Sequence, residues 1–364
     1  MKVHLLFVGN KFIFNTSLRE YVQRNISKSF DYIDNITYFK ESDNSLFTYL
    51  DNLLITDTKV IIITSKQNFS TIGKVICTIT EDNQVLKEGM LIPSESYIYE
   101  KNSYLLEYQQ SAVNVIRIDE MQTIPRLLLE SENAKEILHV FNEDEESLKA
   151  ILTPMAQTYD LKLDLFTLVE GWIQINISSK KFGESSKFIS SVKQLLPSKI
   201  IQTDDMATYI IEKLTQHNKK VTFAESCTGG LLSYYFTSKN GASNILDGSL
   251  VTYSNEIKEN WLAVDEESLK EFGAVSATVV KEMAEGATNV SEADFSLSIS
   301  GIAGDGGGTK DKPVGTVFIG LKTATTSCEI QLNLAGDRNY VQKQSVLYAV
   351  KTLVLSDKVI FFEI

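Results

Sequence analysis

Residues that could carry chemistry stand together in the segment 224–230, whose sequence is AESCTGG. We expect a short strand before this segment and a helix after it, and α/β proteins bind ligands where a strand turns into a helix. Ser226 is therefore a candidate nucleophile, and Thr228 is a candidate ligand hydroxyl. Gly229 and Gly230 would let the backbone approach a ligand, and free amides at the helix start could hold an anion or an oxyanion. Either hydroxyl could instead cap the helix, and this segment alone leaves both roles open.

A serine nucleophile needs a base, and the three histidines of the chain are far apart in sequence. A lysine that is desolvated in a cleft can lose its proton and serve instead. Lys258 is the candidate, because it lies in a second strand-to-helix segment, 253–258 (YSNEIK). A solvated lysine on a helix surface is the competing interpretation. Spacing also leaves three other lysines open: Lys219, Lys220 and Lys239.

Two further segments have the composition of phosphate-binding loops. Residues 298–308 read SISGIAGDGGG after a predicted strand, so successive N–H groups could surround a phosphate. The segment matches neither GxxxxGK[ST] nor GxGxxG, and so neither nucleotide motif applies. Arg338, in the sequence LAGDR, stands beside a glycine at a predicted helix start and could bind a phosphate through two N–H groups. The glycine-rich segment could instead be a flexible connection, and Arg338 could instead form a salt bridge to Asp337.

The elements that must position these residues alternate between strand and helix. Over 203–364 we predict strands at 221–224, 248–253, 295–300, 315–322 and 329–334, and helices at 206–217, 231–237, 257–262, 276–287 and 340–355. Over 1–131 we predict strands at 3–8, 59–64 and 113–118 and a helix at 18–29, with a less regular stretch at 85–111. Residues 132–202 read as a small β-α-β-β-α unit. The sequence predicts a multi-domain α/β fold, with two three-layer α/β domains joined by an α+β module.

Composition excludes several classes of protein. The chain has 364 residues, 43% of them hydrophobic, and a net charge of −12. Such an acidic chain has no electrostatic footprint for nucleic acid or a membrane surface, so neither is expected as a partner. Three cysteines without a CxxC pair argue against a disulfide framework or a zinc site. No targeting segment or long apolar run is recognisable, and we expect a cytoplasmic protein.

Together, the four segments described above resemble the C-terminal domain of the CinA (competence/damage-inducible protein A) family. In that family this domain is a nicotinamide mononucleotide deamidase. The resemblance covers 203–364 and rests on an ordered set of motifs: AESCTGGLL at 224–232, DG at 247–248 with VTYSNEIK at 251–258, GAVS at 273–276, SGIAG at 300–304 with GGG at 306–308, KPVGTV at 312–317 and GDR at 336–338.

This resemblance implies hydrolysis of the carboxamide of nicotinamide mononucleotide, without metal or cofactor. Ser226 would form an acyl-enzyme, Lys258 would transfer the protons, and Tyr253 would orient Lys258 or the ring. Amides near 228–230 or 300–301 would stabilise the oxyanion. Arg338 and the glycines at 306–308 would hold the phosphate. The residues expected to contact the substrate are Glu225, Thr228, Gly229, Gly230, Ser300, Gly301, Gly306, Gly307 and Arg338.

The chain departs from the family pattern at two positions. Ser300 stands where the family has threonine, which keeps the hydroxyl on a less rigid side chain. Asp305 replaces the proline of the family's GPGGG loop and could repel a phosphate. The Ser-Lys chemistry survives both changes.

The N-terminal part resembles the family's molybdopterin-binding-like domain, which in some members is a metal-dependent ADP-ribose pyrophosphatase. Where that domain has a glycine-rich loop, residues 65–71 read SKQNFST. A loop without glycine cannot bring closely packed amides to a pyrophosphate, so we expect residues 1–131 to keep the fold and to have lost the activity. Residues 132–202 resemble the family's KH-like module, and the resemblance implies a homodimer. The alternative function is that of a non-catalytic nucleotide-binding or regulatory protein.

Overall fold

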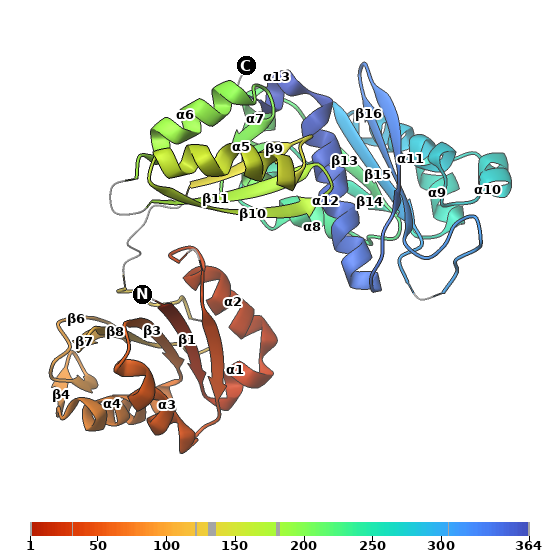
Figure 1. Ribbon diagram of the computed structural model, residues 1–364. Coiled ribbons are helices and arrows are strands. Elements are labelled where there is room, and N and C mark those ends of the chain that lie inside the picture. Colours follow the sequence, from red (N-terminus) through yellow and green to blue (C-terminus); the bar gives the residue numbers. More distant parts are fainter. Residues whose placement is uncertain are drawn as a thin grey trace. The chain divides into compact units, whose positions relative to one another are not determined.

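The structure is a computed structural model, and it describes residues 2–30, 32–120, 122–129, 136–179, 183–304 and 306–362. The chain divides into two compact units, 1–134 and 135–364, which Figure 1 colours from red to yellow and from yellow-green to blue. The second unit contains two separate sheets, so the fold is multi-domain α/β, and the boundaries of a three-domain division stay a prediction. No helix within the described ranges is both long and apolar enough to cross a membrane.

Unit 1 is a sheet with helices on both faces. Its strands are β1 (Lys2–Val8), β2 (Asn35–Phe39), β3 (Thr58–Thr64), β4 (Gln84–Lys87), β5 (Met90–Pro93), β6 (Ile98–Glu100), β7 (Ser103–Tyr108) and β8 (Ser111–Arg117). Its helices are α1 (Asn10–Phe14), α2 (Thr16–Ile26), α3 (Ser45–Leu54) and α4 (Lys66–Thr80). Six strands form the sheet in the order β2-β1-β3-β8-β7-β6, and β4 and β5 form a separate hairpin.

The central strand of unit 1 shows why these layers form. All seven residues of β3 (TKVIIIT) are buried, as expected for a strand covered on both faces. Ile61 and Ile63 pack with α1 and α2, and Val60 and Ile62 pack with α3 and α4. Two predictions need correction here. Residues 65–71 are no loop, because α4 begins at Lys66, and the irregular stretch at 85–111 is largely the strands β4 to β7.

Unit 2 begins with a four-stranded antiparallel sheet in the order β10-β11-β9-β12. Its elements are β9 (Glu136–Phe141), α5 (Glu145–Thr158), β10 (Leu161–Val169), β11 (Trp172–Ser179), α6 (Ser185–Leu195) and β12 (Ile200–Gln202). One face packs on α5 and α6. Phe141 and Trp172 face the other way, into the core of the following sheet, which explains why the two sheets form one unit. The strand β12 is absent from the sequence prediction.

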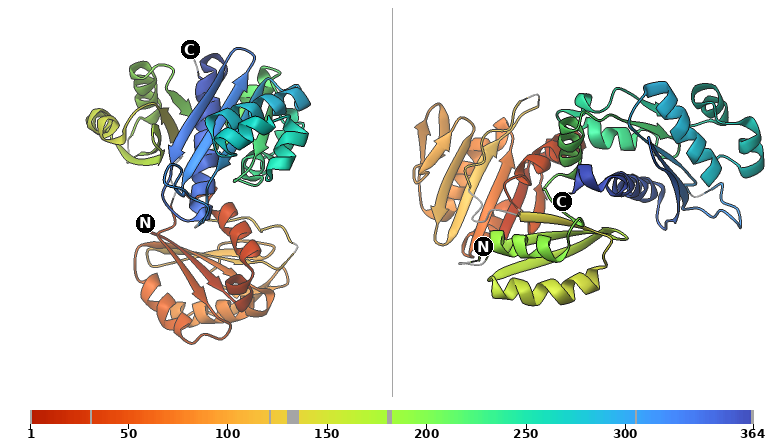
Figure 2. Two further views of the ribbon diagram at one scale, coloured as in Figure 1. Left: turned by 90° about the vertical axis from the view of Figure 1, so that its right-hand side faces the viewer. Right: turned by 90° about the horizontal axis from the view of Figure 1, so that it is seen from above.

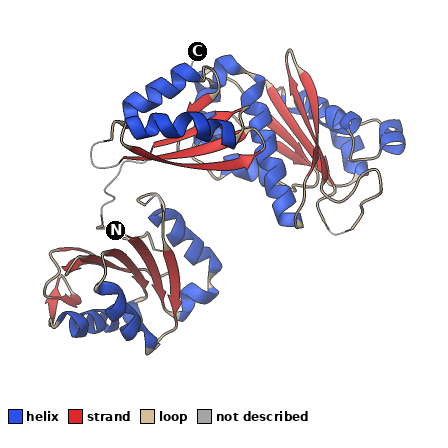
Figure 3. Cartoon of the chain, viewed as in Figure 1, coloured by secondary structure: helices blue, strands red, loops and turns tan. Residues whose placement is uncertain are grey.

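The second sheet of unit 2 has five strands in the order β14-β13-β15-β16-β17, shown as red arrows in Figure 3. Its strands are β13 (Val221–Glu225), β14 (Ser249–Val251), β15 (Phe295–Gly301), β16 (Thr316–Thr323) and β17 (Ser327–Asn333). Its helices are α7 (Met206–Gln216), α8 (Leu231–Thr237), the 3₁₀ helix η1 (Ala242–Asn244), α9 (Asn255–Leu262), α10 (Glu266–Phe272), α11 (Ala277–Ser291), α12 (Arg338–Ser356) and α13 (Lys358–Phe361). The sequence prediction lacks the short helices α10 and α13.

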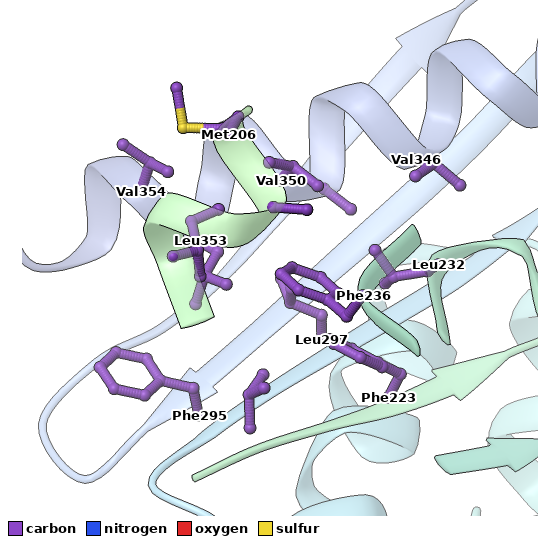
Figure 4. Packing of buried hydrophobic residues seen from close by; sticks show 14 of the residues in the cluster. Met206, Phe223, Leu232, Phe236, Phe295, Leu297, Val346, Val350, Leu353 and Val354 are labelled. Carbon is purple, nitrogen blue, oxygen red and sulfur yellow. The ribbon is translucent and has the colours of Figure 1, made fainter. Parts of the chain in front are cut away.

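The helices of this domain cover opposite faces of the sheet. Helices α7, α8 and α12 pack on one face, where Phe223 and Leu297 meet Val350 and Leu353 (Figure 4). Helices α9, α10 and α11 pack on the other face around Met283. Figure 2 shows the strands lying between these two groups of helices. The arrangement places the carboxyl ends of the parallel strands β13, β14 and β15 at one edge of the sheet.

Candidate active site

The two segments singled out by their chemistry lie side by side at this edge. Strands β13 and β14 are parallel neighbours in which Glu225 is paired with Val251. Ser226 and Thr252 therefore follow at the same level, and the N–H of Thr252 donates to Glu225 O at 2.8 Å. The N–H of Ser226 donates to Ile299 O at 2.9 Å, which fastens the turn to β15 as well. The candidate nucleophile is thus held between three strand ends.

The side chain of Lys258 reaches Ser226 from the first half of α9. Its Nζ lies 3.1 Å from Ser226 Oγ, 2.8 Å from Thr252 O and 3.3 Å from Tyr253 O. The lysine is 1% exposed and the serine 8%. Ser254 caps α9 by accepting from the N–H of Ile257, which fixes the start of the helix that carries Lys258.

Burial makes Lys258 able to act as a base near neutral pH. Desolvation lowers its pKa to about 8, and within the described ranges no carboxylate forms an ion pair with it. The neutral amine has two N–H donors and one lone pair. When Thr252 O and Tyr253 O accept the two N–H groups, the lone pair faces Ser226 Oγ. This is the geometry that a general base for a serine needs.

The three alternative lysines are engaged elsewhere. Lys219 Nζ pairs with Asp294 at 2.7 Å, and Lys220 Nζ pairs with Asp247 at 2.7 Å. Lys239 pairs with Asp205. The thiol of Cys227 is no competing nucleophile either, because burial raises its pKa to about 12. Of the four lysines considered, the structure brings only Lys258 to Ser226.

Glu225 stabilises the loop that follows it through buried hydrogen bonds and is not available to a substrate. It is 0% exposed. Its Oε2 accepts from the N–H groups of Gly230 and Leu232, both at 3.0 Å. Its Oε1 accepts from the N–H of Ser233 at 2.8 Å and from the Ser233 hydroxyl at 2.6 Å. A carboxylate at a helix start satisfies amides that the helix leaves unpaired, so the structure gives this residue a supporting role in place of the expected substrate contact.

Hydrogen bonds within this loop determine which of its amides remain available as oxyanion donors. The N–H of Gly230 is taken by Glu225, and that of Gly229 donates to Ser226 O at 3.1 Å. Within the described parts of the chain, the N–H groups of Cys227 and Thr228 form no hydrogen bond. The glycines contribute backbone shape, with φ values of 59° and 102° that favour glycine. The free donors therefore precede the glycines and do not include them.

Two buried hydroxyls close to Ser226 have no partner among the residues that the structure describes. Thr228 Oγ1 and Thr252 Oγ1 lie in residues that are 2% and 0% exposed, and neither forms a hydrogen bond within the described residues. Buried polar groups are almost always paired, so these hydroxyls are suited to a polar ligand. Ser300, by contrast, donates to Ala274 O at 2.7 Å, and Gly301 ends β15 beside it. Tyr253 is 64% exposed and contacts Lys258 through its carbonyl oxygen, so the phenol is not what orients the lysine.

Arg338 lies at the first turn of α12 with an uncommitted guanidinium. Among the described residues it forms no hydrogen bond and no ion pair, so the alternative of a salt bridge to Asp337 does not hold. The guanidinium packs against Gly304, where any Cβ would collide with it. Its charge also acts on Cys227, which places it near the Ser226 loop.

The glycine-rich loop is anchored at its base. The N–H of Ile302 donates to Thr316 O at 2.9 Å, and the N–H of Gly315 donates to Ile302 O at 2.7 Å. Lys312 Nζ donates to Phe272 O at 2.6 Å. A Cβ at Gly306 would meet nothing within 4 Å, and Gly307 has a φ of 89°. Asp305, the departure from the family pattern, lies outside the described residues. Within those residues no cluster of His, Cys, Asp and Glu could hold a metal ion.

Sequence reasoning missed two residues at the site: Thr252, whose buried hydroxyl has no partner within the described residues, and Gln342. Gln342 Nε2 donates to Cys227 O at 2.7 Å. Its position four residues after Arg338, on the same face of a predicted helix, was the available signal.

Comparison with known proteins agrees with the motifs. Residues 203–356 match the model of the CinA C-terminal domain. A CinA-like protein of Endomicrobium trichonymphae is 37% identical over 230 residues, which are 60% of this chain and 54% of that protein. A CinA-like protein of Thermotoga neapolitana is 33% identical over 223 residues, with the same 60% and 54% coverage. The chain thus spans about half the length of these relatives.

Among solved structures, a competence/damage inducible protein of Agrobacterium tumefaciens is 36% identical, with 41% of this chain and 92% of that chain covered and a TM-score of 0.41. Residues 203–356 are a CinA C-terminal domain, and through this domain the chain belongs to the CinA family.

Proposed function

We propose that residues 203–364 hydrolyse the carboxamide of nicotinamide mononucleotide to nicotinic acid mononucleotide and ammonia. The observation that carries the proposal is the buried contact between Ser226 Oγ and Lys258 Nζ at 3.1 Å, in which the lysine pKa is lowered to about 8. The family resemblance supports the choice of substrate. A cytoplasmic location and a homodimeric assembly belong to the same proposal.

Acylation needs a proton acceptor, an oxyanion site and a proton donor. Ser226 Oγ attacks the carboxamide carbon as its proton passes to the neutral amine of Lys258. The N–H groups of Cys227 and Thr228 stabilise the negative oxygen of the tetrahedral intermediate, and one such donor contributes about 3–4 kcal/mol. The C–N bond then breaks, and Lys258 returns the proton to the leaving nitrogen, which departs as ammonia. An ester of Ser226 remains.

Deacylation repeats these steps with water. Lys258 takes a proton from the water that attacks the ester carbon, and the bond from carbon to Ser226 Oγ breaks. The proton returns to Ser226 Oγ, and the carboxylic acid product ionises, gives its proton to solvent and leaves as the carboxylate. The residues that form bonds or exchange protons in both halves of the reaction belong to the Ser226 loop and to α9.

Arg338 is the residue we propose for binding the substrate phosphate. Arg338 offers a guanidinium that forms no hydrogen bond or ion pair within the described residues, and the open backbone at Gly306 and Gly307 lies in the loop that passes it. A planar guanidinium binds phosphate oxygens through paired N–H groups. We assign Arg338 to the phosphate and the unpartnered Thr228 and Thr252 hydroxyls to the nicotinamide end.

An assay of the full chain tests this function. Purified protein is incubated with nicotinamide mononucleotide, and ammonia and nicotinic acid mononucleotide are measured together with a Ser226→Ala control. The proposal expects equal amounts of both products from the unmodified chain and at least a 1,000-fold loss in the variant, about the scale on which nucleophile removal acts. If the nucleotide raises the melting temperature and neither product forms, the chain is the non-catalytic binding protein of the alternative hypothesis.

Unit 1 is proposed to keep its fold without ADP-ribose pyrophosphatase activity. Strand β3 passes directly into α4, and the sequence there has no glycine-rich loop. Asp119 occupies the position beside the helix start, where its Oδ1 accepts from Lys11 Nζ at 2.8 Å and from the N–H of Lys66 at 3.3 Å. Formation of AMP and ribose 5-phosphate from ADP-ribose by the full chain with added Mg²⁺ or Mn²⁺ would contradict this expectation.

A further inference from the structure

A glutamine of α12 holds the carbonyl group of the residue that follows the candidate nucleophile. Gln342 Nε2 donates to Cys227 O at 2.7 Å, across 115 positions of the sequence. The side chain is partly buried, and it lies one helical turn beyond Arg338. In Figure 1 the helix that carries both residues runs in blue along the five-stranded sheet.

This bond fixes the direction of a whole peptide group. The C=O of Cys227 and the N–H of Thr228 belong to one planar trans peptide, so they point in opposite directions. The C=O points toward α12, on one face of the sheet, and the N–H therefore points away from it. Lys258 enters from α9, which packs on the opposite face. The Thr228 N–H, free of any partner in the described structure, is thus directed to the side where Lys258 meets Ser226.

Other bonds hold the rest of the loop but not this peptide. Glu225 binds the N–H groups of Gly230, Leu232 and Ser233. The N–H of Ser226 is tied to Ile299 O, and its carbonyl accepts from Gly229. Among the described residues, only Gln342 bonds to the peptide between Cys227 and Thr228.

We propose that Gln342 is a positioning residue, which keeps the Thr228 N–H aimed at the oxyanion formed on Ser226. This inference rests on the proposed acyl-transfer chemistry and adds to it the element that orients the oxyanion site. Because Gln342 and Arg338 are four residues apart on one helix, α12 holds the oxyanion donor and the phosphate-binding guanidinium in a fixed relation. An oxyanion donor acts only if it is oriented before the reaction begins.

Substitutions that keep size and remove the donor test the proposal. Gln342→Met has a similar length and no N–H group, and Gln344→Met on the same helix is the matched control. We expect kcat of Gln342→Met to fall about 10- to 100-fold, less than for loss of a donor outright, with KM within threefold of the unmodified chain. Gln342→Lys, which restores a donor, should recover at least half of the lost activity on a logarithmic scale. Gln344→Met should stay within twofold.

Labelling of Ser226 by a fluorophosphonate separates this proposal from the choice of substrate. The phosphonyl oxygen takes the place of the oxyanion, and no nucleotide is involved. Gln342→Met should slow the labelling rate by about the factor seen in kcat. If the unmodified chain is labelled at Ser226 but releases no ammonia, the proposed substrate is wrong and the labelling rates still test Gln342. The proposal would be overturned if Gln342→Met were labelled at a rate within twofold of the unmodified chain. It would also be overturned if this variant had a raised KM and an unchanged kcat. Gln342→Glu provides the same test if the methionine variant does not fold.

Discussion

Lys258 Nζ lies 3.1 Å from Ser226 Oγ in a buried contact that includes no carboxylate among the described residues. The two residues are 32 positions apart, and parallel pairing of β13 with β14 brings them together. Burial rather than a neighbouring charge sets the behaviour of the lysine, because desolvation is the main reason for its lowered pKa. The site therefore combines a nucleophile and a base without histidine.

The rate of amide hydrolysis should rise with pH. The base must be neutral, and the pKa of Lys258 is lowered to about 8, so the protonated form predominates below that value. We expect kcat/KM to increase about tenfold per pH unit below pH 7 and to level off above about pH 8–9. A profile of kcat/KM against pH between 5.5 and 9.5, measured under conditions in which the enzyme stays folded, tests this expectation. A profile that is flat across this range would contradict the assignment of Lys258 as the base.

Replacement of Lys258 should stabilise the protein at neutral pH. The pKa of this lysine is lower in the folded chain than its usual 10.5, so the unfolded chain binds the proton more tightly. Burial of Lys258 therefore lowers the free energy of unfolding most below pH 8, and this cost disappears as the pH rises from 8 to 10.5. At pH 7 we expect Lys258→Met to raise the free energy of unfolding by roughly 1–3 kcal/mol, measured by urea denaturation. Lys343→Met, at an exposed position of α12, is the control. A destabilised Lys258→Met variant would argue against a desolvated lysine.

Loss of the Arg338 guanidinium should weaken substrate binding more than chemistry. A hydrogen bond to a charged group contributes about 1.5–3 kcal/mol, so Arg338→Met should raise KM about 10- to 150-fold with kcat changed less than fivefold. The matched substrate is nicotinamide riboside, which lacks the phosphate and should be affected less than threefold. An equal loss on both substrates would show that Arg338 does not bind the phosphate.

Glu225 should be required for stability of the loop. Its two oxygens accept four hydrogen bonds from α8 and its approach. In Glu225→Gln an NH₂ group would face backbone N–H donors, and the variant should lose roughly 2–4 kcal/mol of unfolding free energy. The exposed Glu271→Gln serves as control in the same urea titration. A loss below 0.5 kcal/mol would show that these bonds contribute little.

His139 should make the protein less stable in acid. It is buried beside Trp172, whose Nε1 donates to His139 Nδ1 at 3.0 Å, and desolvation lowers the pKa of the histidine to about 4. As the pH decreases, this histidine therefore takes up its proton at a higher pH in the unfolded chain than in the folded chain. The free energy of unfolding falls as the pH decreases from 6.5 to 4. Of that fall, we assign roughly 2–3 kcal/mol to His139. His139→Asn should lack this part of the pH dependence, whereas exposed His217→Asn should keep it, as measured by melting at fixed pH values. Equal pH dependence in both variants would contradict this.

Much of the fold could be predicted because its patterns are local. The apolar run in β3, the acidic start of α5 and Pro197 after α6 each indicate an element from neighbouring residues. The strands β4 to β6 were missed because they have only three or four residues each, too few to establish an alternating pattern. Strand β7 begins with four consecutive buried residues and so shows no alternation either. Strand β12, with three residues, depends on pairing with β9 and has no pattern of its own.

The site was predictable only in part, for a related reason. Ser226 and Lys258 follow strand ends, and side chains at such ends meet in a parallel sheet. The burial of Glu225 beneath its own helix start depends on the course of the turn, which composition does not reveal. The four-residue spacing from Arg338 placed Gln342 near the site, but its bond to Cys227 O joins segments 115 positions apart and depends on the packing of α12.

Trapping with hydroxylamine tests the central claim, that the reaction passes through an acyl-enzyme at Ser226. The full chain is mixed with nicotinamide mononucleotide and increasing hydroxylamine, and the nucleotide hydroxamate, the carboxylate product and ammonia are quantified. An acyl-enzyme predicts that hydroxamate replaces carboxylate as hydroxylamine increases, that the sum of the two equals the ammonia released, and that both disappear in Ser226→Ala. Ammonia release with carboxylate as the only product at every hydroxylamine concentration, or undiminished release by Ser226→Ala, would contradict the account.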